Sequence, residues 1–217
     1  MKKTAKKTQK EKNAGTIDDA EVGQFDSLAG KWWEESGPMA PLHRLNPVRL
    51  GYIKNQLCGH FGLNPARPQP LQSLRIADIG CGGGLITEPL SRLGAVVTGI
   101  DAGKENIKAA RAHAHTMGLK IDYRAVTAEK LALTEGSAFD AVTALEIIEH
   151  VADPKLFVSS CCKLLKKGGL AVFSTLNRTP KSFLLGILAA EYIIRWVPAG
   201  THDWKKFIKP SELSRLL

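Results

Sequence analysis

The residues best suited to chemistry occupy two short segments of this 217-residue sequence. The first is a glycine-rich turn, Asp78-Ile-Gly-Cys-Gly-Gly-Gly84, and the second is Leu145-Glu-Ile-Ile-Glu-His150. Glycine has no Cβ and tolerates positive φ, so the turn lets a small molecule touch main-chain amides. The second segment combines two carboxylates with an imidazole, which suits either metal binding or general base catalysis. The two segments therefore predict a ligand site and a reaction site.

The glycine turn differs from that of a dinucleotide-binding enzyme. Such enzymes use Gly-x-Gly-x-x-Gly or Ala, and here the sixth position of the pattern is Leu85. Asp78, directly before the turn, places an anion where a pyrophosphate would otherwise lie, which favours a ligand with a cationic amino acid portion. S-adenosylmethionine is such a ligand, and we expect Gly80 and Gly82 to line its site.

Two further residues are expected to complete the cofactor site. The next predicted strand ends at Asp101, and a carboxylate at that point can accept both hydroxyls of a ribose. Leu145 follows a later strand and is expected to pack on the adenine. The alternatives are a helix cap for Asp101 and an ordinary core position for Leu145.

The second segment predicts where a methyl group goes. On a helical turn Glu146, Glu149 and His150 share one face and offer ligands for Mg²⁺. A metal beside a methyl donor suits O-methylation of a catechol, because chelation lowers the pKa of a phenol. His150, with Glu149 beside it, is alternatively the catalytic base, and the spacing does not separate these roles. An exposed acidic turn capped by His150 is the non-functional alternative.

The elements around both segments predict an α/β fold with a mostly parallel, doubly wound sheet, Rossmann-like and of the class I methyltransferase type. Strand and helix patterns alternate, and ligands of such sheets bind beyond the carboxyl ends of the strands. Helical patterns also precede the sheet, with a Pro-punctuated loop at 39–49 that leads into a helix ending near Leu57. The expected strands are 74–79, 96–100, 121–126, 138–145 and 170–174, and helices are expected at 18–33 and 85–93. The expected regions are 1–15, a disordered basic tail; 16–72, a helical preface and linker; and 73–217, the core with a helical insertion at about 180–198.

Composition limits the classes of partner. The net charge is +9, but the lysine-rich residues 1–12 contribute +5, so nucleic acid binding is not favoured. The four cysteines lack the spacing of a zinc site, and reduced thiols are expected. The longest apolar stretch, 183–197, contains Glu191 and Arg195 and is too short for a membrane span. A cytoplasmic location follows as the expectation.

Several further motifs occur along the chain, at Trp32-Trp33, 41–51, the Gly80 turn, 146–150, 174–178 and 200–203. Through these motifs the sequence resembles the family of ubiquinone biosynthesis O-methyltransferases from about Asp18 onward. That resemblance implies that Arg49, Gly80, Asp101 and Leu145 contact S-adenosylmethionine, and that the cluster of Glu146, Glu149 and His150 holds magnesium. It also implies a lipophilic polyprenyl phenol as substrate, with the inner membrane surface or a ubiquinone-biosynthesis complex as partner. The family continues past Leu217 through further strands.

Two other functions remain open at this level. Some RNA ribose methyltransferases also place a Glu-x-x-Glu-His cluster beside a methyl donor, and the tail is basic. A non-catalytic scaffold that binds the cofactor is the second alternative. The sequence lacks the interleaved aromatic and basic residues of a base-stacking surface, which disfavours the RNA enzyme.

Overall fold

The computed structural model describes residues 15–182 and 204–217. Nearly all of the expected basic tail therefore lies outside the described residues, as does the expected helical insertion except for its first turn, α7 (Pro180–Ser182).

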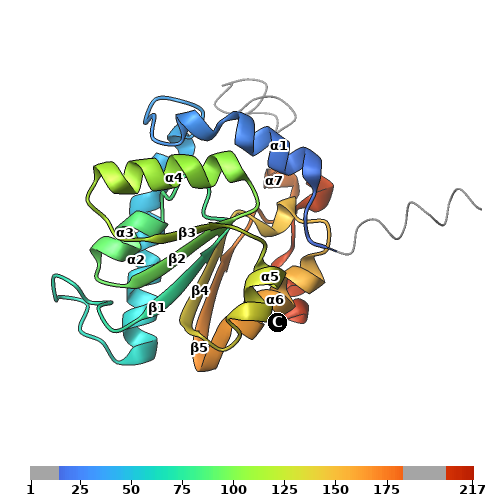
Figure 1. Cartoon of the computed structure of the whole chain (residues 1–217). Helices are drawn as coiled ribbons and strands as arrows, with labels where there is room; N and C mark the ends of the chain where they lie inside the picture. Colours follow the sequence, from blue (N-terminus) through green and yellow to red (C-terminus); the bar gives the residue numbers. More distant parts are fainter. Residues whose placement is uncertain (1–14, 183–203) are drawn as a thin grey trace, which may run out of the picture.

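A parallel sheet of five strands forms the centre of the described chain (Figure 1). Its order is β3-β2-β1-β4-β5, and every neighbouring pair is parallel. The direction of winding reverses between β1 and β4, which is where ligands bind in sheets of this kind. The predicted doubly wound α/β fold is thus confirmed. The strands are β1 (Arg75–Ile79), β2 (Val96–Asp101), β3 (Asp122–Ala125), β4 (Phe139–Leu145) and β5 (Leu165–Ser174).

Helices cover both faces of the sheet (Figure 1). On one face Ile76 and Ala141 pack among side chains of α2 and α3, and Tyr123 packs against α4. On the other face Ala77 and Val142 pack against α5 and α6, with α8 at the margin. Alternate residues of β1 therefore serve opposite cores, as the period of a strand requires. The helices are α2 (Ala40–Phe61), α3 (Thr87–Arg92), α4 (Lys104–Thr116), α5 (Ala128–Thr134), α6 (Pro154–Leu164) and α8 (Pro210–Leu216).

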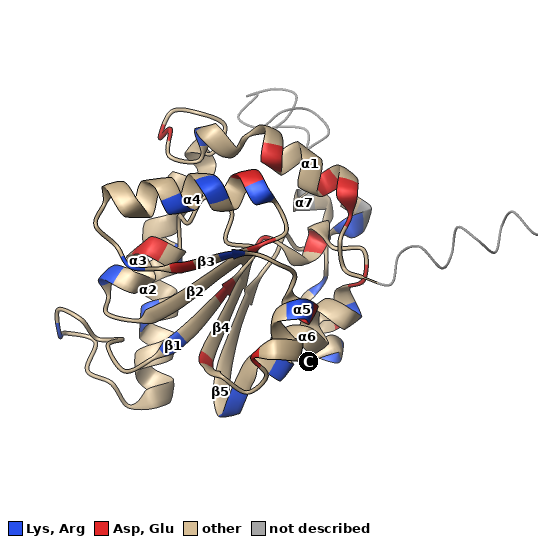
Figure 2. Ribbon diagram, viewed as in Figure 1, with Lys and Arg blue, Asp and Glu red and all other residues tan. Residues whose placement is uncertain are grey.

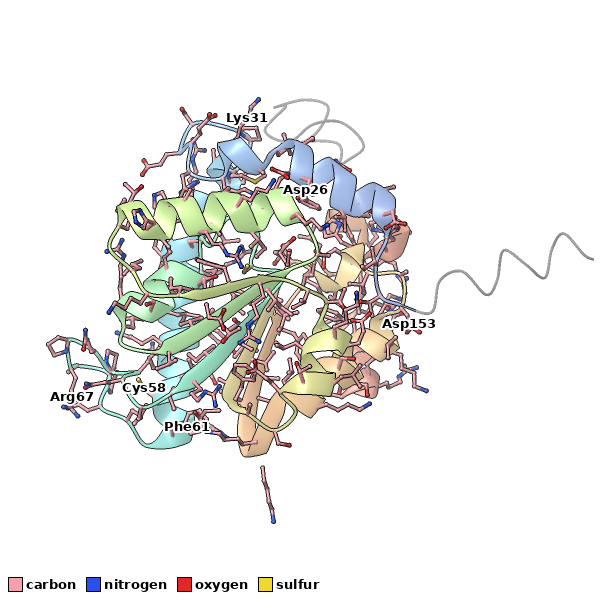
Figure 3. The ribbon with its side chains drawn as sticks, in the orientation of Figure 1. Asp26, Lys31, Cys58, Phe61, Arg67 and Asp153 are labelled. Atoms are coloured by element: carbon pink, nitrogen blue, oxygen red, sulfur yellow. The ribbon has the colours of Figure 1, made fainter. Side chains whose placement is uncertain are left out.

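The segment before α2 crosses the end of the sheet and is tied down at two points. The hydroxyl and backbone N–H of Thr16 donate to the carboxylate of Glu129 in α5. Helix α1 (Asp19–Ser27) follows, and its Asp26 accepts from the backbone N–H groups of Glu105 and Asn106 at the start of α4 (Figure 3). An anion at a helix N-terminus is stabilising, so α1 is held over α4. A 3-10 turn, η1 (Ala29–Lys31), links α1 to the segment before α2.

The prediction of a Pro-punctuated loop at 39–49 is wrong, because helix α2 begins at Ala40 and includes the rest of these residues. Pro41 lies in the first turn, where its missing N–H costs nothing. Pro47 lies inside the helix and leaves one helical hydrogen bond unmade, yet burial of Ile53 and Leu57 holds the helix against the sheet. Tertiary packing here outweighs the local preference of proline.

Two smaller expectations about helices also change. Helix α3 begins at Thr87 rather than Leu85, since Gly84 still closes a turn onto Cys81. Residues 18–33 form α1 and η1 rather than one helix.

No helix within the described residues is long and apolar enough to span a membrane. All four cysteines are free, as expected.

Candidate active site

A cavity of about 390 Å³ lies between the N-terminal segment and the carboxyl ends of the strands. Its floor comes from the turn after β1, the end of β2 and the end of β4. Helices α1 and α2 supply the opposite wall, including Phe25, Leu42 and Arg49. Both segments that the sequence singled out face this one cavity, at the point where the strand order reverses.

The glycine turn has the backbone that the sequence predicted. Gly80 and Gly82 have φ values of 71° and 52°, a region that L side chains rarely adopt. The backbone N–H of Gly80 donates to the carbonyl of Ile100 at 2.8 Å, which ties the turn to β2. A Cβ on Gly80 would lie 2.6 Å from Ile147. At Gly82 the space of a Cβ is filled by the ring of Trp32, so this glycine admits a side chain of the protein as well as lining the cavity.

Asp101, at the end of β2, is joined to the turn by hydrogen bonds. Its Oδ2 accepts from the backbone N–H of Gly82 at 3.0 Å, and its Oδ1 accepts from that of Gly103 at 2.7 Å. Burial raises the pKa of this carboxyl, and the hydrogen bonds oppose that shift. Leu145 ends β4 and also lines the cavity, partly buried.

Asp78, at the end of β1, is the most deeply buried carboxylate of the site, at 3% exposed. Burial raises its pKa to about 6, although hydroxyl groups of Thr87 and Thr143 donate to it at 2.6 and 2.7 Å. Hydrogen bonds to the charged form lower a pKa, so the raised value reflects the removal of this carboxylate from water. A positively charged ligand in the cavity would offset part of the cost of burying the charge.

Trp32 links the N-terminal segment to the glycine turn and to α4. Its ring packs over Gly82 and Gly83, and its indole N–H donates to the side chain of Asn106 at 2.8 Å. The amide of Asn106 in turn donates to Asp101 at 3.3 Å. The spacing of residues in the sequence does not indicate this connection. Trp32 was noted only as part of a motif shared with the family.

Trp33 holds the same turn from outside. Its indole N–H donates to the carbonyl of Gly83 at 3.0 Å, and its ring stacks on His113 with centroids 3.5 Å apart. Nδ1 of His113 lies 2.7 Å from the buried carboxylate of Glu88 in α3. The two tryptophans therefore fix the glycine turn between α3 and α4.

Glu146 does not lie on a helical turn, contrary to the expectation. It has a φ of 51°, and the only helical residues of the segment are η2 (Ile148–His150). Its Oε1 lies 2.8 Å from a guanidinium nitrogen of Arg49 and accepts from the hydroxyl of Ser174 at 2.8 Å. The left-handed residue turns this carboxylate toward α2.

Glu149 is buried, and its Oε2 accepts from the hydroxyl of Thr175 at 2.9 Å. Burial, followed by the charge of Glu146, raises the pKa of Glu149 to about 7. The carboxylates of Glu146 and Glu149 are therefore close enough to repel each other. Both face the cavity beyond the carboxyl ends of β4 and β5.

His150 points to the opposite wall. Its Nδ1 lies 3.0 Å from Oε2 of Glu21 in α1, and Phe25 of the same helix meets its ring edge-on at 5.1 Å. A carboxylate only accepts, so Nδ1 carries the proton and the lone pair of the neutral ring lies on Nε2. Lys206 donates to the other oxygen of Glu21 at 2.8 Å. Glu21 was missed by sequence reasoning, which has no signal for a partner so distant.

The three expected metal ligands are thus neighbours in the cavity but do not share one face. In the part of the chain that the structure describes, no group of three His, Cys, Asp or Glu side chains is arranged to hold a metal ion. Arg49 engages Glu146 and Glu21 engages His150, which directs the side chains apart.

The charge of the cavity wall favours a cationic ligand. Arg49 is its one Lys or Arg among the described residues, and acidic residues also mark α1 (Figure 2). A wall of this sign attracts a sulfonium and an ammonium and repels phosphates. Its carboxylates are Asp18, Glu21, Asp78, Asp101, Glu146 and Glu149.

Comparisons with known proteins relate the chain to methyltransferases. A family model described as a methyltransferase domain matches residues 77–173. A protein named ubiquinone biosynthesis O-methyltransferase from Roseobacter denitrificans is 54% identical over 202 residues, which are 93% of this chain and 81% of the relative. Another of that name, from Dinoroseobacter shibae, is 50% identical over 94% of this chain and 82% of its own length.

A solved structure supports the fold alone. That of the cyclase SpnF has a TM-score of 0.55 and is 20% identical, covering 76% of this chain and 55% of that chain.

Proposed function

The chain belongs to the family of ubiquinone biosynthesis O-methyltransferases. We propose how its cavity transfers a methyl group. The donor is S-adenosylmethionine, and the acceptor is a catechol-type ring hydroxyl of a polyprenyl ubiquinone precursor. The observation that carries the assignment is the joint placement, in one acidic cavity, of the glycine turn after β1 and the His150–Glu21 pair.

The described residues fit the cofactor. Gly80 and Gly82 offer backbone at the floor, and Asp101 is proposed to accept from the ribose hydroxyls. Leu145 is proposed to pack against the adenine. The raised pKa of Asp78 supports a cation nearby, which the ammonium group of the cofactor provides. When bound, S-adenosylmethionine supplies a methyl group activated by a positively charged sulfur.

Arg49 is proposed to exchange partners when the cofactor binds. In the structure one guanidinium nitrogen of Arg49 lies 2.8 Å from Glu146. A guanidinium can instead bind the carboxylate of a methionine portion in a bidentate manner. Moving Arg49 to the cofactor would leave Glu146 and Glu149 as two adjacent carboxylates with no cation.

Magnesium is a further proposal that depends on this exchange. As arranged in the structure, Glu146, Glu149 and His150 do not fit a metal site with three protein ligands. The two carboxylates, once freed of Arg49, have the oxygen donors that Mg²⁺ prefers. Bound there, the ion would lower the pKa of a catechol hydroxyl.

His150 is proposed to act as the general base. Its Nε2 accepts the proton of the ring hydroxyl, while Glu21 fixes the tautomer and stabilises the imidazolium that forms. Glu149 is proposed to orient the neighbouring hydroxyl of the ring. The cavity is proposed to hold donor and acceptor together in the orientation for transfer, which supplies much of the rate enhancement.

The other functions considered receive less support. An RNA ribose methyltransferase needs a surface that attracts phosphates, whereas this cavity is lined by acidic residues. Because polyprenyl phenols reside in the bilayer, we also propose that the enzyme meets its substrate at a membrane surface or within a ubiquinone-biosynthesis complex.

A transfer assay tests the function. Labelled S-adenosylmethionine, magnesium and a short-tailed prenyl catechol are incubated with the protein, and labelled methyl is expected on the ring oxygen. His150→Ala is expected to lower kcat by about 100-fold or more. Labelling of RNA but not of the catechol would support the RNA enzyme, and cofactor binding without transfer would support a scaffold.

A further inference from the structure

Helix α2 carries a stripe of exposed apolar side chains that belong to no hydrophobic cluster of the described residues. Leu45 is 44% exposed, Val48 71% and Tyr52 59%. Their spacing of i, i+3 and i+7 places them on one face of the helix. Ile53 and Leu57, on the other side of α2, pack into the core and hold the helix on the sheet.

The stripe is continuous with the active-site cavity through Leu45. That residue lines the cavity and is also partly exposed at its margin. Pro41 and Leu42, one turn earlier on α2, line the cavity as well. Val48 and Tyr52 do not, so they extend the apolar surface from the cavity outward along the helix.

The size of the cavity requires an exit of this kind. At about 390 Å³ it lies near the lower end of the range for small-molecule sites. A long polyprenyl tail comes in addition to the cofactor and the aromatic ring, and the three together exceed a site of this size. The tail of a bound substrate must leave the cavity and remain on an apolar surface, because each methylene exposed to water is unfavourable.

The proposed position of the acceptor ring indicates where the tail leaves the cavity. Arg49 follows Leu45 by one helical turn and contacts Glu146, which belongs to the cluster proposed to hold the ring. A tail that starts at a ring beside Glu146 reaches Leu45 first and then Val48 and Tyr52.

We propose that the stripe formed by Leu45, Val48 and Tyr52 is the binding track for the isoprenoid tail of the substrate. This inference rests on the proposed function and adds the specificity subsite to it. The track is open at its outer end, so it accepts tails of different lengths. The first isoprenoid unit lies at Leu45, and the units beyond it contact Val48 and Tyr52.

Paired substrates test the track. Val48→Asp and Tyr52→Asp are compared with the unmodified protein on a catechol with one isoprenyl unit and on one with a long polyprenyl tail, both in detergent micelles. The variants are expected to raise KM for the long-tailed substrate by about tenfold and to leave kcat/KM for the short-tailed one unchanged. The control is Leu133→Asp in α5, an 87% exposed leucine that does not line the cavity, and it should change neither value.

The outcomes separate the inference from the function. Equal losses on both substrates, or none on either, would overturn the track. Losses that occur only when the substrate is delivered in phospholipid vesicles would overturn it in favour of a membrane-docking face. Absence of turnover of the short-tailed catechol by the unmodified protein would instead overturn the proposed function.

A labelling experiment gives a second readout that does not depend on turnover. A long-tailed catechol with a photoreactive group on its tail is expected to label a peptide that contains Val48 or Tyr52. Labelling confined to other peptides would contradict the track.

Discussion

The carboxylate of Glu21 lies 3.0 Å from Nδ1 of His150, although 129 positions separate the two residues in the chain. Glu21 belongs to α1, outside the sheet, and His150 ends the segment after β4. The pairing fixes which ring nitrogen carries the proton and so makes Nε2 the acceptor. It also places the N-terminal segment at the wall of the cavity that is proposed as the reaction site.

Replacement of Glu21 tests this pairing directly. Glu21→Gln keeps the size of the side chain but removes the charge that stabilises an imidazolium, so kcat should fall by about 10- to 100-fold with a smaller change in KM. Steady-state kinetics with a short-tailed catechol measure this. Asp19→Asn, an exposed position on the same helix, is the matched control, and equal effects of the two variants would contradict the assignment.

Cofactor affinity should depend on pH through Asp78. Its pKa of about 6 lies above the ordinary value of 3.8 because burial disfavours the charge. A bound cation favours the ionised form, so binding releases protons below about pH 6 and affinity should fall by up to about tenfold per unit below that pH. Calorimetry in two buffers of different ionisation enthalpy measures the release.

The matching variant is Asp78→Asn. It should bind S-adenosylmethionine more weakly at pH 7.5 and lose the pH dependence between 5 and 7. A variant that keeps the full dependence would show that another group is responsible.

Arg49 should couple the cofactor to magnesium. If it leaves Glu146 for the cofactor, Mg²⁺ binds the unmodified protein detectably only when S-adenosylhomocysteine is present. Arg49→Gln should bind Mg²⁺ without the cofactor, and should weaken S-adenosylmethionine binding by about 10- to 100-fold. Calorimetric titrations of each ligand with and without the other measure the coupling.

The metal itself can also be removed. Chelation of Mg²⁺ is expected to lower turnover and readdition to restore it. Lys54→Gln, elsewhere on α2, should behave as the unmodified protein. Turnover that is indifferent to chelation would remove magnesium from the proposal without affecting the role of His150.

Trp33 should stabilise the glycine turn. Trp33→Phe keeps an aromatic ring over His113 but removes the hydrogen bond to the carbonyl of Gly83. Loss of one such bond is expected to lower the free energy of unfolding by about 1 kcal/mol and to weaken cofactor binding severalfold. Urea unfolding and cofactor titration measure the two effects.

Trp33→Ala removes the stacking as well and should be more destabilising than Trp33→Phe. If Trp33→Phe matches the unmodified protein in both measurements, the turn does not depend on the indole N–H.

Patterns among neighbouring residues explain which features of the fold and the site could be predicted from the sequence. The strand, the glycine turn and the start of α3 are continuous in the chain, and glycine at positions 80 and 82 permits the positive φ that the turn requires. The carboxylate at the end of β2 follows from the same logic, because parallel strands end at one edge of the sheet. These features predicted the fold class and the cofactor site without any long-range information.

The Glu146–His150 segment shows where that reasoning failed. Its spacing predicted a shared helical face, but Glu146 adopts a left-handed conformation that a sequence pattern rarely indicates for glutamate. The prediction for residues 39–49 failed for a different reason. The prolines indicated a loop, but burial of α2 against the sheet stabilises the helix more than the prolines disfavour it.

The sequence by itself determined the sheet, the turn and the identities of the ionisable groups, because these depend on residue type and on neighbours in the chain. Only the tertiary structure decided their partners. It brought Glu21 to His150, Arg49 to Glu146 and Trp32 to the glycine turn. Each pairing depends on how the N-terminal segment packs across the end of the sheet, and that packing is set by burial and by contacts between residues far apart in the chain.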